Sequence, residues 1–173
     1  MSSALIRPAR PADGEAIARV HVDTWRDAYA GILPTDYLVK RVRFGARQAL
    51  WKLGVAPSRS RMDETLVAEV AAVVGFISFG NARHARGRVG EIYALYVQPD
   101  MQGQGLGRSL VEVALDRMFA AGFEQVDVEV LAANPSRHFY AALGATIVGQ
   151  GTHRFAGERL PVIYYRWQRP EGA

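Results

Sequence analysis

The sequence predicts a mixed α/β fold, a sandwich in which helices cover a sheet, built as a single domain over residues 1–173. Apolar residues recur at helical spacing in 16–28 and 106–118, whereas 65–79, 91–97 and 126–131 show β-type patterns. Glycine or proline separates most of these segments. The expected element order is β-αα-βββ-α-β-α-ββ, with no internal repeat and no low-complexity segment.

Composition narrows the classes of function. Hydrophobic residues make up 49% and charged residues 22% of the chain, which is ordinary for a globular protein. No apolar run reaches the ~18 residues of a membrane span, and the N-terminus lacks a secretory signal pattern. There are no cysteines, which excludes disulfides and an acyl-cysteine intermediate and agrees with a reducing compartment. We therefore expect a cytoplasmic protein that does not bind membranes.

The charge pattern points to a small anionic ligand rather than to nucleic acid. The net charge of +4 is mild, and it favours an anionic partner. Lysine and arginine are scattered along the chain, without a basic run interleaved with aromatic residues. Direct nucleic-acid recognition is therefore not expected.

The N-terminal third reads as one short strand and two helices. Residues 5–7 form the strand, which Pro8 ends, and Asp13 is placed to cap a helix that reaches Ala28. Gly31 and Pro34 separate this helix from a second one, which begins at Thr35 or Asp36 and runs toward Leu53. Residues 54–63 are rich in Pro, Ser and Arg and read as a loop.

Strand patterns dominate the middle of the chain. Residues 65–70 and 73–79 are β-rich runs with a short turn between them, which predicts a hairpin. Residues 81–90 are polar and read as a loop. The run 91–97 is apolar at alternate and intervening positions except at Glu91, as in a central strand covered on both faces, and Pro99 ends it.

The last third alternates helices and strands. A helix follows the glycines near position 105, with Gly122 as its C-cap, and a strand covers 126–131. Residues 134–143 form a short helix that ends at Gly144. Strands at 145–148 and 162–167 are expected to be joined by a turn-rich loop. The helix that follows the glycines has an apolar stripe formed by Leu106, Leu110, Val113, Ala114 and Met118.

Three glycines at alternate positions, Gly103, Gly105 and Gly107, lie between a strand and a helix. The first N–H groups of a helix have no internal partner, and the helix dipole adds positive potential, so this arrangement can bind an anion. Gln102 and Arg108 can add side-chain donors. The spacing fits neither a Walker loop nor a dinucleotide-binding turn. A tight turn that merely packs the helix against the strand remains open as the structural alternative.

Three segments carry a resemblance to a known family. Residues 102–107 (Gln-Gly-Gln-Gly-Leu-Gly) fit the signature Q/R-x-x-G-x-G/A, and residues 134–145 are similar to a segment with Asn followed by Phe-Tyr and Gly. Residues 24–34 resemble the first helix of a bacterial subgroup. These motifs are those of the GCN5-related N-acetyltransferases, the GNAT family, and the resemblance covers nearly the whole chain.

The resemblance implies a fold and a donor. The fold is a central mixed, largely antiparallel sheet flanked by helices and splayed between the fourth and fifth strands, with acetyl-CoA in the gap and no metal. It implies that backbone groups of Leu95 and Val97 pair with pantetheine, and that the N–H groups of 103–108 hold the pyrophosphate. A backbone N–H near Val97 would stabilise the oxyanion. The implied cofactor-binding residues are Leu95, Tyr96, Val97, Gln102, Gly103, Gln104, Gly105, Leu106, Gly107, Arg108, Asn134, Ser136 and Tyr140.

The resemblance also implies a reaction, in which a primary amine of a small-molecule acceptor attacks the acetyl group directly in a ternary complex. Tyr140 matches the tyrosine that protonates the leaving thiolate. Glu91 and Glu129 both remain candidates for the base. Trp25 and Tyr29, four residues apart on a helix, either line the acceptor pocket or pack against the sheet.

Further expectations concern partners and alternatives. His21, His84, His138 and His153 have no metal-ligand spacing, so no metal site is expected. The loop 149–161 lies where the family contacts the acceptor or a second subunit, and a homodimer is expected. A protein N-terminal or lysine acetyltransferase and a catalytically silent acyl-CoA-binding module remain as alternative functions.

Overall fold

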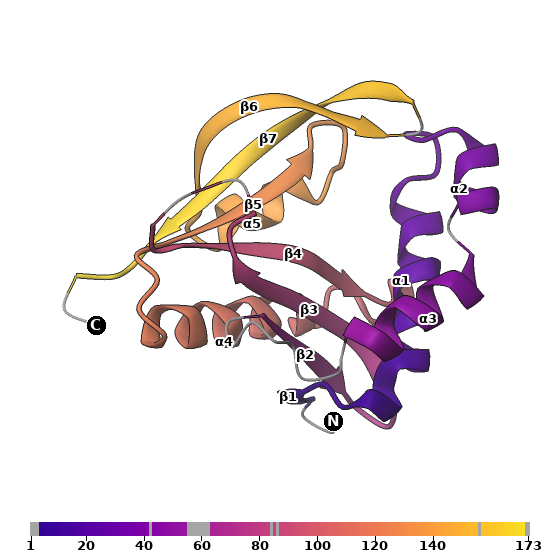
Figure 1. Ribbon diagram of the computed structural model, residues 1–173, viewed down its shortest axis with the longest axis horizontal. Helices are drawn as coiled ribbons and strands as arrows, with labels where there is room; N and C mark the ends of the chain where they lie inside the picture. Colours follow the sequence, from indigo (N-terminus) through magenta and orange to yellow (C-terminus); the bar gives the residue numbers. More distant parts are fainter. Residues whose placement is uncertain are drawn as a thin grey trace.

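The computed structural model describes residues 4–41, 43–54, 63–83, 85, 87–155 and 157–171, and its centre is one mixed sheet. The strand order is β1-β2-β3-β4-β5-β7-β6, and every neighbouring pair is antiparallel except β4 with β5 (Figure 1). The strands are β1 (Leu5–Pro8), β2 (Glu64–Glu69), β3 (Val73–Asn81), β4 (Val89–Val97), β5 (Gln125–Leu131), β6 (Thr146–Phe155) and β7 (Glu158–Gln168). The predicted mixed, largely antiparallel sheet is confirmed.

Helices cover both faces of this sheet. Figure 1 shows α1, α2 and α3 grouped at one end of the molecule, with the β6–β7 hairpin reaching over toward α2. The helices are α1 (Gly14–Ala28), α2 (Thr35–Arg41), α3 (Phe44–Gly54), α4 (Leu106–Ala120) and α5 (Arg137–Ala142), with two 3-10 turns, η1 (Pro11–Asp13) and η2 (Pro99–Met101). Among the described residues, no helix is long and apolar enough to span a membrane.

Alternation along the strands divides the core into two layers. Leu66 and Ile77 face the layer formed with α4, whereas Val67 and Phe76 face the layer formed with α1 and α3. Successive side chains of a strand point to opposite faces, so a strand covered on both sides is apolar throughout. This accounts for the continuous apolar runs of β2 and β3.

The single helix predicted from Thr35 toward Leu53 is wrong, because α2 ends at Arg41 and α3 begins at Phe44. Leu38 packs in a cluster with Val22 and Leu33, whereas Trp51 packs beside Phe76 on the sheet. Two apolar faces that point at different parts of the core require a break between the helices. Of the predicted loop 54–63, residues 55–62 lie outside the described residues.

The turn-rich loop predicted between 148 and 162 is also wrong, because β6 runs to Phe155 and β7 begins at Glu158, and the two strands pair as a long hairpin. Gly149 and Gly151, which read as loop residues, lie in β6 against the ring of Tyr164. A Cβ added at Gly151 would lie 3.2 Å from Tyr164 Cε2. Glycine in a strand marks such a close approach.

Two helix starts differ from the expectation in detail. Asp13 precedes α1, but its carboxylate accepts hydrogen bonds from the Arg7 guanidinium (2.7 Å) and the Arg10 N–H (2.7 Å) instead of capping the helix. The short helix α5 begins at Arg137 rather than near position 134. Its start is delayed because Asn134 Oδ1 accepts a hydrogen bond from the Ser136 N–H (2.9 Å), which forms an Asx turn.

Candidate active site

The sheet opens between β4 and β5. The two strands pair in parallel only from Val89 and Gln125 to Ile92 and Val128, and no pairing follows. A cavity of about 820 Å³ occupies the opening, lined by β4, β5, the C-terminal end of α1, the glycine turn before α4, and α5. The predicted splay between the fourth and fifth strands is therefore present.

The backbone of β4 turns unpaired polar groups toward this cavity. The Gln98 N–H donates to Val74 O of β3 (2.8 Å), so by alternation the backbone groups of Leu95 and Val97 point away from β3. The Val97 carbonyl confirms this direction, because it accepts hydrogen bonds from Gln102 Nε2 (3.0 Å) and Thr24 Oγ1 (3.3 Å). The N–H groups of Leu95 and Val97 and the Leu95 carbonyl thus remain available in the gap.

The glycine turn is open where a ligand would need space. Gly103 (φ +75°) and Gly105 (φ +82°) adopt the left-handed conformation, and a Cβ at either would meet no atom within 4 Å. Gly107 differs, because a Cβ there would lie 3.4 Å from Phe139 Cζ. In this fully described segment, the N–H groups of residues 103–108 have no hydrogen-bond partner. The turn therefore both packs α4 against α5, through Gly107, and presents free N–H groups to the cavity.

Three other side chains of this segment have mainly local partners. Gln102 ties the turn to β4 through the Val97 carbonyl. Arg108 lines the cavity but pairs with Glu112 (3.6 Å) on the surface of α4, a contact that stabilises little. Gln104 Nε2 lies 3.9 Å from Met101 Sδ, and Gln104 is absent from the cavity wall.

Tyr140 lies on α5 at the cavity wall, and only 9% of it is exposed. The rings of Phe139, Tyr165 and Trp167 surround it at centroid distances of 5.3, 6.0 and 6.0 Å. Burial, and to a lesser extent the neighbouring Tyr29, raise the pKa of the Tyr140 phenol well above its usual value. The hydroxyl therefore stays protonated at neutral pH and carries a proton at the cavity wall. Asn134 and Ser136 line the cavity beside it.

Of the two aromatic residues predicted for the acceptor pocket, only Tyr29 lines the cavity. Burial raises its pKa, while interactions with the Tyr96 hydroxyl and Asn134 oppose that rise. Trp25 packs edge-on against Tyr29, with the ring centroids 4.8 Å apart. Trp25 Nε1 is buried near the Tyr96 hydroxyl, without a hydrogen bond of good geometry among the described residues. Trp25 therefore supports the wall from behind.

The two carboxylates that the sequence left as alternatives differ in position. Glu91 is buried and engaged by Arg83, whose N–H donates to Oε2 (2.9 Å) and whose Nε donates to Oε1 (3.2 Å). Glu91 does not line the cavity, whereas Glu129 does. The Glu129 side chain is 28% exposed, and its Oε1 lies 2.9 Å from His153 Nδ1 on β6. Geometry therefore favours Glu129 for a role at the cavity.

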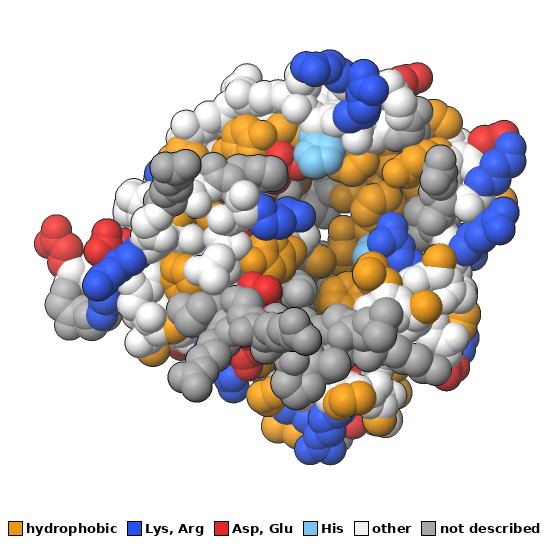
Figure 2. All heavy atoms as spheres, in the orientation of Figure 1, with side chains coloured by type: hydrophobic (Ala, Val, Ile, Leu, Met, Phe, Trp, Pro, Cys, Tyr) orange, Lys and Arg blue, Asp and Glu red, His pale blue; other side chains and the backbone are white. Residues whose placement is uncertain are grey.

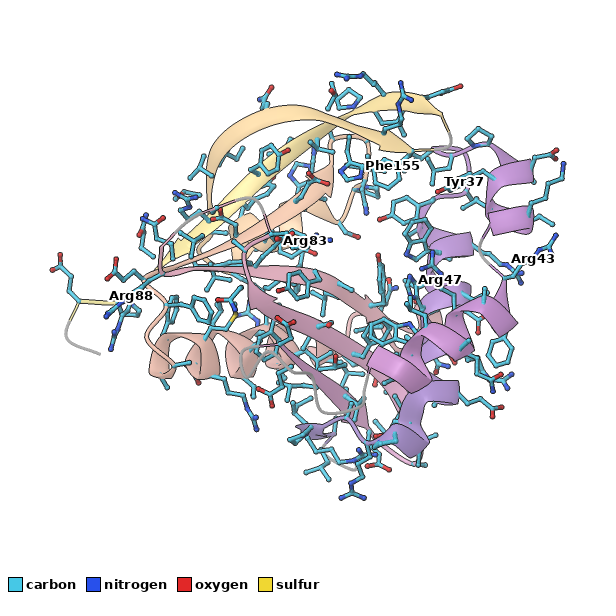
Figure 3. All side chains as sticks on the ribbon, viewed as in Figure 1. Tyr37, Arg43, Arg47, Arg83, Arg88 and Phe155 are labelled. Carbon is cyan, nitrogen blue, oxygen red and sulfur yellow. The ribbon has the colours of Figure 1, made fainter. Side chains whose placement is uncertain are left out.

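A hollow lined largely by hydrophobic side chains lies on the face shown in Figure 2, between the α1–α3 group and the strands. Figure 3 shows Tyr37, Arg47 and Phe155, from α2, α3 and β6, extending toward this hollow. The Arg47 guanidinium lies 5.6 Å from the Trp25 ring centroid, and no acidic side chain in the described ranges pairs with it. No local sequence pattern predicts this grouping, because its members come from three separate elements.

The family model described as "Acetyltransferase (GNAT) family" matches residues 23–145 of the chain. The chain belongs to the GNAT family. The match includes β4, the glycine turn and α5, which together form most of the cavity wall. The resemblance seen in the sequence motifs is thus confirmed.

Individual relatives agree with this assignment. An uncharacterized N-acetyltransferase, YuaI, from Bacillus subtilis is 36% identical over 165 residues, covering 94% of this chain and 91% of the relative. The fold is similar to a GCN5-related N-acetyltransferase from Rhodopseudomonas palustris (22% identity, TM-score 0.77, 98% of each chain). It is also similar to yncA, a putative acetyltransferase from Salmonella typhimurium solved with acetyl-CoA (26% identity, TM-score 0.73, 99% and 97% of the two chains).

No group of three or more His, Cys, Asp or Glu side chains gathers in a metal-binding arrangement among the described residues. His21 and His153 instead serve as hydrogen-bonding or ion-pairing groups, with Trp51 and Glu129 respectively. His138 lies exposed on α5 beside Arg137. His84 lies outside the described residues.

The buried His21 is expected to make the stability of the protein sensitive to acid. It is buried, its Nδ1 accepts a hydrogen bond from Trp51 Nε1 (3.0 Å), and burial followed by repulsion from Arg47 lowers its pKa from 6.5 to about 3. Below pH 6.5, His21 therefore binds a proton in the unfolded state but stays neutral in the native state. The free energy of unfolding falls as the pH falls. Between pH 6.5 and 4.5 we expect this group to remove roughly 2–3 kcal/mol from the free energy of unfolding.

Urea unfolding at several pH values checks this expectation. His21→Gln keeps an acceptor for Trp51 but does not titrate, so the stability difference between wild type and variant isolates the contribution of His21. That difference is expected to move in favour of the variant as pH falls. A difference that is constant over this range would show that folding does not lower the pKa of His21.

Proposed function

We propose that the protein is an acetyl-CoA-dependent N-acetyltransferase that transfers an acetyl group to the primary amine of a small-molecule acceptor. The observation that carries this proposal is a single cavity that joins free N–H groups of the glycine turn, unpaired backbone of β4, Tyr140 and Glu129. Solved relatives in complex with CoA or acetyl-CoA support the choice of donor. No cysteine is present, which supports direct transfer in a ternary complex.

The donor would bind mainly through backbone. Pantetheine amides would pair with Leu95 and Val97 as an added strand, because β5 leaves these groups unpaired. The pyrophosphate would take the N–H groups of residues 103–108 at the start of α4. Left-handed glycines at 103 and 105 keep side chains out of that position. Tyr96, Leu106, Asn134 and Ser136 would complete the walls.

In the proposed reaction, Glu129 and Tyr140 transfer protons at opposite stages, Glu129 before the attack and Tyr140 when the thiolate leaves. Glu129 would accept a proton from the acceptor ammonium, and the resulting free amine would attack the thioester carbonyl carbon. The Val97 N–H would stabilise the oxyanion. Collapse of this intermediate would break the C–S bond, and Tyr140 would give its proton to the departing thiolate. The nitrogen, which carries a positive charge after the attack, would lose its second proton through water to the resulting tyrosinate, so the neutral amide forms and Tyr140 is restored.

Packing of the β6–β7 hairpin favours a small acceptor. Phe155 and Leu160 of the hairpin pack against the α1–α2 cluster of Val22, Leu33 and Leu38. This contact closes one side of the hollow, where an extended peptide would need an open groove. A protein N-terminal or lysine acetyltransferase is the second candidate, and the placement of Glu129 and Asn134 on the cavity wall favours it.

Calorimetry with acetyl-CoA, combined with a CoA-release assay over a panel of amines, tests the function. The panel contains polyamines, aminoglycosides, amino acids and a peptide, and amino acids are included because Arg47 can bind a carboxylate at the hollow. We expect acetyl-CoA to bind and a small amine to turn over. Turnover of the peptide alone supports the second candidate, and binding without any turnover indicates a silent acyl-CoA-binding module.

We further propose that the chain works as a single domain in the cytoplasm, as a homodimer and without a metal. β6 is an edge strand with Ile147 (57%) and Val148 (47%) exposed, which supports pairing with a second copy. Light scattering on the purified protein measures the mass. A mass near the 19.0 kDa of one chain would contradict the dimer.

Tyr140→Phe is expected to lower kcat by about tenfold to 100-fold while leaving acetyl-CoA affinity nearly unchanged. The substitution removes only the hydroxyl, and the ring keeps its contacts with Phe139, Tyr165 and Trp167. Steady-state kinetics and calorimetry check the two quantities separately. Unchanged kcat, with chemistry shown to be rate-limiting, would remove Tyr140 from the acid role.

A further inference from the structure

The face of the β5–β7–β6 region that carries Glu129 has an unusual sequence pattern on β6. Glu129 pairs in register with Tyr164, and Tyr164 pairs with Gly149. Because alternate residues share a face, Gly151 and His153 point to the same side as Glu129. The two glycines make room for the Tyr164 ring, which lies over them. The pattern Gly-x-Gly-x-His thus lets a histidine two strands away approach Glu129.

The resulting contact is close and specific. His153 Nδ1 lies 2.9 Å from Glu129 Oε1, and the imidazole packs on Phe155 with centroids 4.6 Å apart. The His153 side chain is 49% exposed, more than the 28% of the Glu129 side chain. The Tyr164 hydroxyl also interacts with Glu129. The charge of Arg83 also acts on Glu129, and that of Glu91 acts on Tyr164.

We propose that His153 is a positioning residue for the base: its Nδ1–H donates to Glu129 Oε1 and so fixes the carboxylate that takes the proton of the acceptor ammonium. The proposal rests on the role of Glu129 in the proposed function. A glutamate side chain has several rotamers, and a proton acceptor is effective only within hydrogen-bond reach of its donor. The imidazole, fixed in turn by Phe155, restricts those rotamers.

The contact differs from a surface ion pair that contributes little. Exposed pairs are weak because both partners are free in water. Here Glu129 is only 28% exposed and forms part of the cavity wall. Loss of the contact would therefore let the Glu129 side chain adopt other rotamers at the proposed reaction site. The expected effect is therefore on catalysis far more than on stability.

The tautomer of His153 tests the contact without any acceptor. In a two-dimensional ¹⁵N–¹H spectrum of the imidazole groups at pH 8, the signals of His153 are those that disappear in His153→Asn. We expect the wild type to show the Nδ1–H tautomer, because the carboxylate accepts from that nitrogen, and Glu129→Ala to show the Nε2–H tautomer. An Nε2–H tautomer in the wild type, or no change in Glu129→Ala, would overturn the contact.

Kinetics test the role, with the panel amine that gives the fastest CoA release. We expect His153→Ala to lower kcat about tenfold with acetyl-CoA affinity unchanged, and His153→Asn, which places an amide N–H near the position of Nδ1, to recover most of the rate. In the Glu129→Ala background, His153→Ala is expected to cause no further loss. Arg154→Ala, on the opposite face of β6, is the matched control and should behave as wild type.

The failures of the two proposals are distinguishable. Normal kcat in His153→Ala together with a large loss in Glu129→Ala would overturn only the role of His153. An equal loss from His153→Ala in both backgrounds would show that the histidine acts on structure rather than through Glu129. Normal kcat in Glu129→Ala would overturn the proposed base, and the role of His153 with it.

Discussion

Gly105→Asp is expected to abolish measurable acetyl-CoA binding. Gly105 lies at φ +82° immediately before α4, and an added Cβ enters open space at the cavity. The aspartate would therefore occupy the position proposed for the pyrophosphate. Two like charges 4 Å apart repel by about 4 kcal/mol at an effective dielectric constant near 20. We expect the dissociation constant, measured by calorimetry, to rise by a factor of about 100 or more.

Two variants separate the charge from the strain. Gly87→Asp places the same residue at φ +93°, also with no atom within 4 Å of the new Cβ, but outside the cavity wall. Both aspartate variants should lose a similar amount of stability, on the order of 1 kcal/mol, and only Gly105→Asp should lose binding. Gly105→Asn tolerates the left-handed conformation without adding charge, so it should bind more tightly than Gly105→Asp. Normal binding by Gly105→Asp would show that the pyrophosphate lies elsewhere.

The parts of the fold that local sequence determines could be predicted. The glycine turn and α4 depend on spacing within a few residues, and the hydrophobic pattern of 65–79 gave β2 and β3 correctly. The β6–β7 hairpin could not be predicted, because Gly149 and Gly151 weaken the strand pattern locally. Only the packing of Tyr164, from another strand, explains them. Tertiary contact overrode propensity at this hairpin.

The site shows the same division between local and distant information. The glycine turn and Tyr140 lie in short motifs, so the sequence found them, and the structure places both on one cavity. Glu91 and Glu129 could not be separated, since both interrupt apolar strands. The difference between them comes from Arg83, which binds Glu91, and from His153, which approaches Glu129 across β7. The hollow in Figure 2 is the least predictable part, because its walls come from different elements.

Glu129→Gln is expected to lower kcat by about 100-fold to 1,000-fold at neutral pH, since the amide cannot accept the ammonium proton. The loss should shrink at higher pH. Below the pKa of an alkylamine, about 10, each increase of one pH unit raises the fraction of free amine tenfold. A plot of log kcat against pH for the variant should therefore rise with a slope near one. The wild type should rise less steeply where Glu129 removes the proton. Parallel pH profiles for the two enzymes would show that Glu129 takes no proton.

Glu91→Gln is the matched control, because Glu91 has the same side chain on the neighbouring strand and its register partner, Asp127, lies two residues from Glu129. Gln at position 91 can still accept from the Arg83 N–H, but it loses the charge that pairs with the guanidinium. We expect kcat to stay within about threefold of wild type and the melting temperature to fall by a few degrees. The opposite result, a large loss of kcat at position 91 and none at 129, would assign the base to Glu91 and require Arg83 to move aside during the reaction.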